Sequence, residues 1–544
     1  MKQKYTILYD TTLRDGAQGV GIAYSVEDKL RILARLDALG LPYVEGGYPG
    51  ASPKEAEFFA RVAAGELKLA NTQLVAFGTT RRAGVEATAD TGLATLLDAD
   101  TEVVCLVAKA WDHHVRETLR TTLEENLAML RDSVRLCKEA GRMAPRKVIV
   151  DLEHYFDGYA VNPDYAREML VAACEAGADT VVLCDTNGGT LPACVSSVVK
   201  EAGECVHSYE NHCQNRDEVR NLLLGVHFHN DTGCAVANSL LAVEAGADQV
   251  QGTVNGYGER AGNADLLVVA ASLVTKMGDS CLSNEQLAQL TEVSRFVADV
   301  ANMSLDQHHP YTGKAAFSYK AGLHASALDR LDKAYEHIEP EAVGNLARVV
   351  VSDLAGRASL KLKATALGRE VSDEDAIAVL ARIKELEQAG YSFEAADASL
   401  ALLIDKEQGS YRPLFRLESF RVEADKREDG RVTTEATIKL HVGDERFVAI
   451  GEGNGPVNAL DIALRNALTP FYPELAGISL LDYKVRVLDE SSGTDAVTRV
   501  LITSGDERQT WGTVGVSPNI IEASWEALVA SLEYGLTNRD SGAF

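Results

Sequence analysis

Short apolar runs alternate with amphipathic segments through the first half of the chain. Eight of these runs are nearly continuous in hydrophobicity, and several are rich in β-branched residues, as strands buried on both faces of a parallel sheet are. They cover residues 5–10, 43–48, 73–78, 102–108, 147–155, 179–186, 224–231 and 249–256. The pattern therefore predicts eight buried parallel strands.

The segments between these strands carry the start and stop signals of helices. Ser25 has Asp28 three positions later, at the spacing of a capping box, and Gly40 follows the last apolar position. Asn162–Pro163 and Gly177 mark the two ends of a second helix in the same way. These signals predict helices in the connections between the strands.

One pentapeptide, EAGAD, precedes two of the predicted strands, at 175–179 and at 244–248. A recurring helix–glycine–strand unit is typical of a repeated βα architecture. Eight such strands fit a (β/α)8 barrel, whose usual size is about 250 residues. A doubly wound sheet is the weaker alternative, because no G-x-G-x-x-G follows the first strand. We therefore predict an α/β fold, with a TIM barrel as the catalytic domain over residues 1–280.

The pattern changes twice after the barrel. Residues 281–405 are helical in pattern and highly charged, which predicts a helical linker region. Residues 406–544 contain three alternating strands followed by a helix, and then the same order again. The sequence thus predicts an α+β C-terminal domain with an internal duplication.

The composition is that of an ordinary soluble globular protein, with 46% hydrophobic and 24% charged residues in 544. A formal net charge of −27 argues against nucleic acid or an anionic membrane as a partner. Nine cysteines without a C-x-x-C motif are typical of reduced thiols. The sequence shows neither a signal peptide nor an apolar run of about 20 residues. We therefore expect a cytoplasmic protein with no membrane partner.

The pentapeptide HFHND, residues 227–231, is the first sign of chemistry. In a strand, His227 and His229 point to the same face. The pair by itself is consistent with a metal site and equally with two core histidines. Other polar residues favour the metal, because they also stand at strand ends, where the functional residues of a barrel gather. These are Arg14, Asp15, Glu45, Glu153, Thr186 and Asn263.

Two imidazoles and a carboxylate would leave open positions on a divalent metal ion. Such a set suits Zn, Mn, Mg or Co, and the sequence does not choose among them. Open neighbouring positions would let a 2-oxo acid chelate through its keto and carboxylate oxygens. Arg14 stands beside Asp15 and is placed to stabilise an oxyanion. A structural ion pair with Glu45 is the other interpretation of Arg14, and the two roles are compatible.

Longer motifs carry a resemblance to a known family. They are LYDTTLRDGAQ (8–18), VHFHNDTGCAVANSLLAVEAGADQVQGTVNGYGERAGN (226–263) and FSYKAGLHASAL (317–328). With these motifs the chain resembles the acyltransferases that condense acetyl-CoA with 2-oxo acids, namely the 2-isopropylmalate, homocitrate and citramalate synthases. The stretches VEGGYPGASPKEAEFF, DLEHYFDGY and AYEHIEPEAVGN look most like the long-chain citramalate synthase branch.

The resemblance implies an activity and its participants. The chain would condense the co-substrate acetyl-CoA with pyruvate in a metal-dependent Claisen reaction, giving (R)-citramalate and CoA for isoleucine biosynthesis. The alternatives are a 2-isopropylmalate or homocitrate synthase, or a carbon–carbon lyase or aldolase on the same barrel. The resemblance also implies a homodimer, whose regulatory and dimerisation domain at residues 406–544 binds an amino-acid effector.

The same resemblance assigns roles to residues. Arg14, held by Glu45, would stabilise the enolate or alkoxide, and Thr186 would bind the carboxylate of the 2-oxo acid. Glu153 would deprotonate acetyl-CoA, with a hydrogen-bonded core carboxylate as the alternative interpretation. The metal ligands would be Asp15, His227 and His229, with Asn263 as a weaker or water-mediated fourth. The linker region, of the partner subunit, would add His324 and Tyr335.

Two further groups of residues attract attention beside these. Arg81 and Arg82, just after the third strand, would be either a cation pair for the CoA phosphates or an ordinary solvated pair. DHH at 112–114 and HCQNR at 212–216 are interpreted as solvated loops rather than metal sites, since they lie outside the strand ends.

Overall fold

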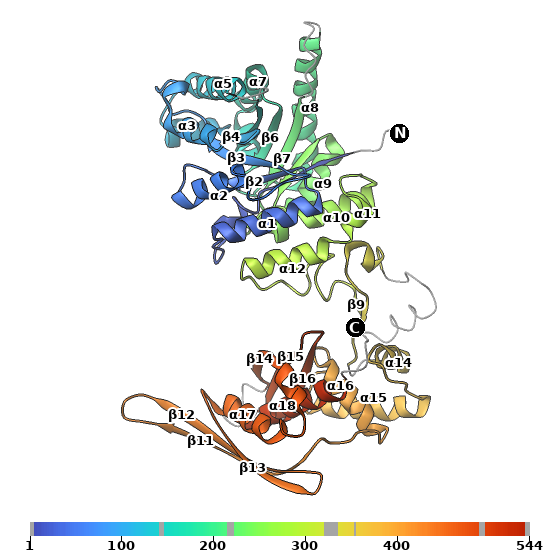
Figure 1. Cartoon of the computed structure of the whole chain (residues 1–544). Helices are drawn as coiled ribbons and strands as arrows, with labels where there is room; N and C mark the ends of the chain where they lie inside the picture. Colours follow the sequence, from blue (N-terminus) through green and yellow to red (C-terminus); the bar gives the residue numbers. More distant parts are fainter. Residues whose placement is uncertain are drawn as a thin grey trace. The chain divides into compact units, whose positions relative to one another are not determined.

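The computed structural model of the chain describes residues 5–140, 146–214, 222–319, 336–352, 355–488 and 496–538. The chain divides into two compact units (Figure 1). The first is Met1–Phe317 with Ile338–Leu346, and the second is Ser318–His337 with Ala347–Phe544. The three domains predicted from the sequence, with boundaries at 280 and 405, stay a prediction. No helix in the described ranges is both long enough and apolar enough to cross a membrane.

Eight parallel strands form a closed barrel in the first unit, which confirms the predicted fold class. Each strand pairs with the next along the chain, and β8 closes on β1 through pairs such as Tyr9 with Gln251. The strands are β1 (Ile7–Asp10), β2 (Tyr43–Gly47), β3 (Gln73–Thr79), β4 (Val103–Lys109), β5 (Lys147–Glu153), β6 (Thr180–Asp185), β7 (Leu223–Phe228) and β8 (Gln249–Gly252).

Helices connect the barrel strands, as the punctuation predicts. Ser25 and Asp28 form the capping box of α1, and Gly40 ends that helix in the left-handed conformation at φ 87°. The longer helices are α1 (Val26–Leu39), α2 (Pro53–Ala63), α3 (Thr91–Asp98), α5 (Leu123–Glu139), α7 (Pro163–Ala176), α8 (Pro192–Gln214), α9 (Ala235–Ala245), α10 (Leu266–Met277) and α12 (Leu290–Val300). Shorter ones are α4 (Asp112–His114), α6 (Tyr155–Val161) and α11 (Asn284–Leu287).

Single helical turns complete this unit. They are Gly16–Gln18, Ala87–Ala89, Val115–Leu119, Val254–Gly256 and Pro340–Val343. One of the loop interpretations is wrong: Asp112–His114 forms a helical turn directly after β4, and Asp112 is buried. Of the 212–216 segment, the part up to Gln214 belongs to α8, and the rest lies outside the described residues.

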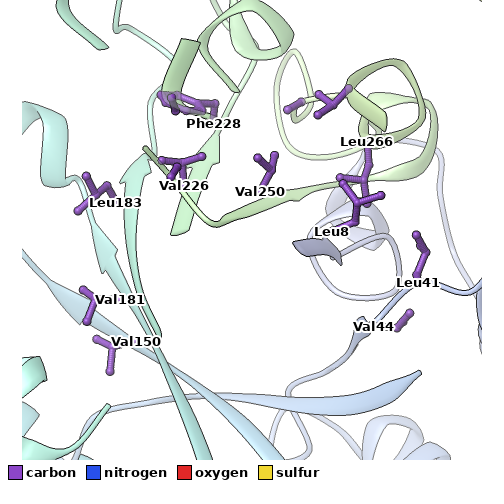
Figure 2. Packing of buried hydrophobic residues seen from close by; sticks show 14 of the residues in the cluster. Leu8, Leu41, Val44, Val150, Val181, Leu183, Val226, Phe228, Val250 and Leu266 are labelled. Atoms are coloured by element: carbon purple, nitrogen blue, oxygen red, sulfur yellow. The ribbon is translucent and has the colours of Figure 1, made fainter. Parts of the chain in front are cut away.

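Alternate side chains of the strands form two separate apolar layers. On β6, Val182 and Cys184 belong to a cluster inside the barrel, whereas Val181 and Leu183 belong to the large core between strands and helices. Figure 2 shows the outer layer, including Val181, Leu183, Val226 and Phe228. Because the side-chain period of a strand is two, the histidines on either side of Phe228 face the barrel interior.

The second unit contains the predicted duplication. Strands β11 (Arg416–Lys426), β12 (Val432–Val442) and β13 (Glu445–Gly453) form an antiparallel sheet, followed by α17 (Pro456–Leu468). The same order recurs in β14 (Ser479–Val487), β15 (Thr498–Gly505), β16 (Thr510–Ser517) and α18 (Ile520–Thr537). Two sets of elements precede this duplication in the sequence. They are the short parallel pair β9 (Ser318–Tyr319) and β10 (Arg348–Val349), and the helices α14 (Arg357–Ala366), α15 (Asp373–Gln388) and α16 (Asp397–Glu407). A turn at Pro473–Gly477 follows α17.

Candidate active site

A cavity of about 620 Å³ opens at the carboxyl ends of the barrel strands. Its wall contains most of the residues that the sequence singled out, brought together from five different strand ends. Those in the wall are Arg14, Asp15, Glu153, Thr186, His227 and His229, with Arg81 and Arg82. Glu45 and Asn263 are buried beside them. His324 and Tyr335 lie outside the described residues, so their roles stay predictions.

Asp15, His227 and His229 form a compact group of possible metal ligands. The Nε2 atoms of His227 and His229 lie 3.3 Å and 3.6 Å from Oδ2 of Asp15. One ligand atom from each residue lies within 4.8 Å of the other two, and all three side chains are buried. Strand β7 ends at Phe228, earlier than the predicted 231, but His229 keeps its inward direction. This arrangement can hold a divalent cation.

Asn263 lies close to this group and has a free acceptor. It forms an isolated bridge with His229, and its Nδ2 donates to the carbonyl of Tyr257 at 3.1 Å. Its Oδ1 is buried and has no hydrogen-bond partner among the described residues. Gly258 makes room for the amide, since a Cβ there would lie 2.1 Å from Asn263 Nδ2. Two imidazoles, a carboxylate and, on the residue bridged to His229, a buried amide oxygen without a hydrogen-bond partner make a donor set that fits a divalent metal.

The charges of the group also suit a metal. Burial alone would raise the pKa of Asp15, but Arg14 and His227 hold it well below its usual range. Burial lowers the pKa of His229 to about 4, so this imidazole is neutral at pH 7. Burial alone would lower the pKa of His227, whereas its hydrogen bond to Asp15 and that carboxylate's charge raise it. An ionised carboxylate and a neutral imidazole are the forms that bind metals.

Arg14 is held from several sides. Its Nε donates to Oε1 of Glu45, and its Nη1 lies 3.3 Å from Oδ2 of Asp15. Its guanidinium stacks on Phe77, 4.2 Å from the ring centroid. Tyr9 donates to the second oxygen of Glu45 at 2.6 Å, so both oxygens of this fully buried carboxylate are engaged. The structural ion pair considered from the sequence therefore exists, and it orients the guanidinium toward the cavity.

Glu153 and Thr186 lie in the cavity wall on neighbouring strand ends. Glu153 contacts the ammonium group of Lys109, which stands opposite it at the end of β4. The Thr186 hydroxyl oxygen accepts a hydrogen bond of 2.9 Å from the backbone N–H of His154. Because that oxygen is used as an acceptor, its own proton is available for an acceptor in the cavity.

Sequence reasoning missed Lys109, Asp151 and Gln251. Asp151 is two residues before Glu153 on the same face of β5, and burial raises its pKa to about 6. Gln251 lies on β8 inside the barrel. The sequence did contain a signal for Asp151 and Gln251. In the segments DLE and QVQG, polar residues alternate with apolar ones inside strands that are otherwise apolar.

The two arginines beyond β3 lie at the cavity wall but already have acidic partners. Arg81 pairs with Glu125 at 2.7 Å and with Asp132 at 2.9 Å. Arg82 pairs with Asp90 at 3.0 Å and has an exposed side chain. Arg81 is therefore neither a solvated residue nor an unpaired cation, and Arg82 is the more accessible charge.

The sequence model of the HMGL-like family matches residues 6–297, more than half of the chain. The chain belongs to the HMGL-like family. After the family's barrel region, residues 311–390 match the homocitrate synthase post-HMGL domain-like model. Residues 394–536 match the model of the LeuA allosteric (dimerisation) domain.

Curated relatives cover nearly the whole chain. The (R)-citramalate synthase of Streptomyces coelicolor is 50% identical over 97% of this chain and 96% of its own length. That of Geobacter sulfurreducens is 47% identical over 97% of each chain. A probable 2-isopropylmalate synthase of Methanopyrus kandleri is 31% identical over 96% of each chain. These identities confirm the predicted resemblance to this group of synthases and to its citramalate synthase branch.

Proposed function

We propose that the protein condenses acetyl-CoA with pyruvate and releases (R)-citramalate and CoA. The observation that carries this proposal is the 50% identity to a curated (R)-citramalate synthase over 97% of the chain. The cavity supports it, because a possible metal site, a fixed guanidinium and a carboxylate converge on one space. In the reaction a C–H bond of the acetyl methyl group breaks and a C–C bond forms to the keto carbon. Water then breaks the thioester C–S bond.

Asp15, His227 and His229 would hold a divalent cation in this enzyme, with Asn263, which is bridged to His229 through the backbone, as a weaker or water-mediated fourth ligand. When bound, the cation supplies Lewis-acid polarisation of the substrate keto group. Arg14 keeps its guanidinium fixed by Glu45 and Phe77, and donates to the oxygen on which negative charge develops. The oxygen-and-imidazole donor set supports the prediction of Zn, Mn, Mg or Co without selecting one of them.

Thr186 and Glu153 would act on the two substrates from neighbouring strand ends. The hydroxyl of Thr186 donates to the carboxylate of the 2-oxo acid, since its oxygen is already used as an acceptor. Glu153 takes a proton from the acetyl methyl group, and Lys109 holds its Oε2 in place during the transfer. His324 and Tyr335, offered by the partner subunit, belong to the same proposal.

The match of residues 394–536 to an allosteric dimerisation model supports a homodimer regulated by an amino acid. Isoleucine is the effector we propose, because the product belongs to isoleucine biosynthesis in the proposed function. A cytoplasmic location belongs to the same proposal. It agrees with the free thiols of eight cysteines in the described ranges.

Thiol release from acetyl-CoA, measured across a panel of 2-oxo acids, tests the function. We expect kcat/KM to be highest with pyruvate, and chelation of divalent cations to abolish the release. Replacing Asp15 by Asn removes a charged ligand and should have the effect of chelation, whereas Asp164→Asn on the surface of α7 should not. A clear preference for 2-oxoisovalerate or 2-oxoglutarate would contradict the substrate assignment.

A further inference from the structure

A chain of buried hydrogen bonds runs behind the possible metal ligands. Oε1 of Gln251 lies 2.9 Å from Nδ1 of His227, and Nε2 of Gln251 lies 2.9 Å from Oδ1 of Asp151. The three side chains belong to β8, β7 and β5, and each is at most 4% exposed. Because β5 and β8 are not neighbours, the bond between Gln251 and Asp151 crosses the barrel interior. Gln251 is not one of the residues that line the cavity.

The donors and acceptors in this series of hydrogen bonds all run in one direction. An ionised carboxylate only accepts hydrogen bonds, so Asp151 takes the N–H of the Gln251 amide. The amide oxygen is thereby turned to His227, and Nδ1 of that imidazole must be the donor. Nδ1 then carries a proton whether or not Nε2 does, and Nε2, which lies 3.3 Å from Oδ2 of Asp15 and hydrogen-bonds to it, is the nitrogen left to give up its proton and bind a cation. A buried amide between a carboxylate and an imidazole therefore selects the tautomer that presents Nε2 as a ligand.

We propose that Gln251, oriented by Asp151, is the positioning residue that fixes the tautomer and ring angle of His227 for metal binding. The inference rests on the metal site of the proposed function and extends it to two residues with no role so far. An unsupported imidazole would sample both tautomers and other ring angles, and each of these lowers the population able to bind the cation. Gln251 itself touches no substrate, so it should act through metal affinity.

Gln249 provides a matched control on the same strand. It lies two residues before Gln251, on the same face of β8, and is equally buried at 1% exposure. Neither polar atom of its amide has a hydrogen-bond partner among the described residues. Replacing either glutamine by methionine changes the core in a similar way, but only Gln251→Met removes the support of His227.

Mn2+ affinity of the full-length protein, measured by calorimetry or by the spin-resonance signal of free Mn2+, tests the inference at pH 8. We expect Gln251→Met to weaken binding about 10- to 100-fold. The matched variant Gln249→Met should leave the affinity unchanged. Raising the Mn2+ concentration should restore the kcat of Gln251→Met, with an unchanged KM for pyruvate. Equal Mn2+ affinities of the two variants would overturn the inference.

Asp151 offers a second test that does not depend on the folding of Gln251→Met. Asp151→Asn keeps an oxygen that accepts from the Gln251 amide, so it should retain most of the Mn2+ affinity. Asp151→Leu removes the acceptor and should weaken Mn2+ binding as Gln251→Met does. If Asp151→Asn and Asp151→Leu weaken Mn2+ binding equally, the orienting role of Asp151 is refuted.

The outcomes separate this inference from the proposed function. If the wild-type protein produces citramalate and the two glutamine variants bind Mn2+ equally, the function stands and the positioning role fails. If Gln251→Met alone weakens Mn2+ binding while no citramalate is formed from pyruvate, the positioning role stands and the substrate assignment fails.

Discussion

Charged side chains at the cavity are held in defined pairs. Arg14 is fixed by Glu45 and Asp15, and Glu153 is fixed by Lys109. Pairing inside a partly buried wall gives each charged group one position, and fixed groups are the condition for electrostatic stabilisation of a transition state. The ion pair that the sequence suggested for Arg14 is present, and its catalytic role stays a prediction.

Glu153→Gln should remove the proposed base while keeping the size of the side chain. We expect kcat for thiol release with pyruvate to fall about 10²- to 10⁴-fold, the usual contribution of a positioned acid or base. Mn2+ affinity should not change, because Glu153 is not among the possible ligands. Exchange of the acetyl-CoA methyl protons with deuterated water provides a direct measurement of the same step.

The control for this experiment is Glu175→Gln on α7, a carboxylate with a surface partner, Arg131, at 3.1 Å. It should leave kcat unchanged. A Glu153→Gln variant with wild-type kcat and exchange rate would show that another group removes the proton.

His309 should make stability depend on pH. Its Nε2 lies 2.7 Å from Oδ2 of Asp265, the N-cap of α10, and its Nδ1 lies 2.8 Å from the Thr312 hydroxyl. Burial alone would lower the pKa of His309, but the bond to Asp265 raises it. A raised pKa means that the stabilisation is complete below about pH 6.5, the value of an unfolded histidine, and disappears as pH rises through the folded pKa.

His309→Gln should therefore cost about 1.5–3 kcal/mol of unfolding free energy at pH 6, typical of a polar interaction with a charged group, and less at pH 9. Urea unfolding at both pH values measures the difference. His308→Gln is the control, since that side chain is exposed. An equal cost of His309→Gln at pH 6 and pH 9 would refute the role of its charge.

At the scale of elements, one buried lysine joins two helices and a strand. Lys29 on α1 donates to both oxygens of Glu55 on α2 at 2.6 Å and to the carbonyl of Gly46 at 2.9 Å. Its side chain is 2% exposed, and burial lowers its pKa. Gly46 follows Glu45 on β2, so the contact also fixes the strand that holds Arg14.

Lys29→Met should destabilise the barrel by about 3–5 kcal/mol, because it leaves a half-buried carboxylate and a carbonyl without their partner. Arg31→Met on the exposed face of the same helix should cost less than about 0.5 kcal/mol, since its pair with Asp28 is 4.0 Å long and solvated. Urea unfolding followed by circular dichroism measures both variants. Equal stability of the two would contradict a structural role for Lys29.

At the scale of the whole molecule, the second unit exposes apolar side chains on a sheet. Val448 and Ile450 on β13 are each 53% exposed. Their neighbours Phe447 and Ala449 point the other way and pack into the core of the unit. Exposed apolar residues on a sheet, in a region that matches a dimerisation domain, support the homodimer proposed above.

We expect the protein to sediment with twice its chain mass of 58.5 kDa. Val448→Glu with Ile450→Glu should shift it toward the single chain, since burial of each such side chain contributes about 1.5–3 kcal/mol. Ile377→Glu on α15 is the control, at 57% exposure. If the double variant and the control both sediment as dimers, the interface lies elsewhere.

The sequence by itself determined whatever depends on neighbours along the chain. Nearly continuous apolar runs gave the eight strands of the barrel, and the side-chain period of two gave the common direction of His227 and His229. Ser25 and Gly40 gave the ends of α1, because caps are satisfied within a few residues. Arg14 and Asp15 were found because they follow a strand, and functional groups of a barrel lie at that end.

Only the tertiary structure decided which of these residues meet. Lys109 reaches Glu153 because β4 and β5 are in register, and Gln251 reaches Asp151, 100 positions away, because the barrel closes. Such pairings depend on strand order, register and curvature, which no local pattern encodes. The stacking of Arg14 on Phe77 and the acidic partners of Arg81 were hidden for the same physical reason: hydrogen bonds and ion pairs act over ångströms in space, whereas the sequence orders residues only along the chain.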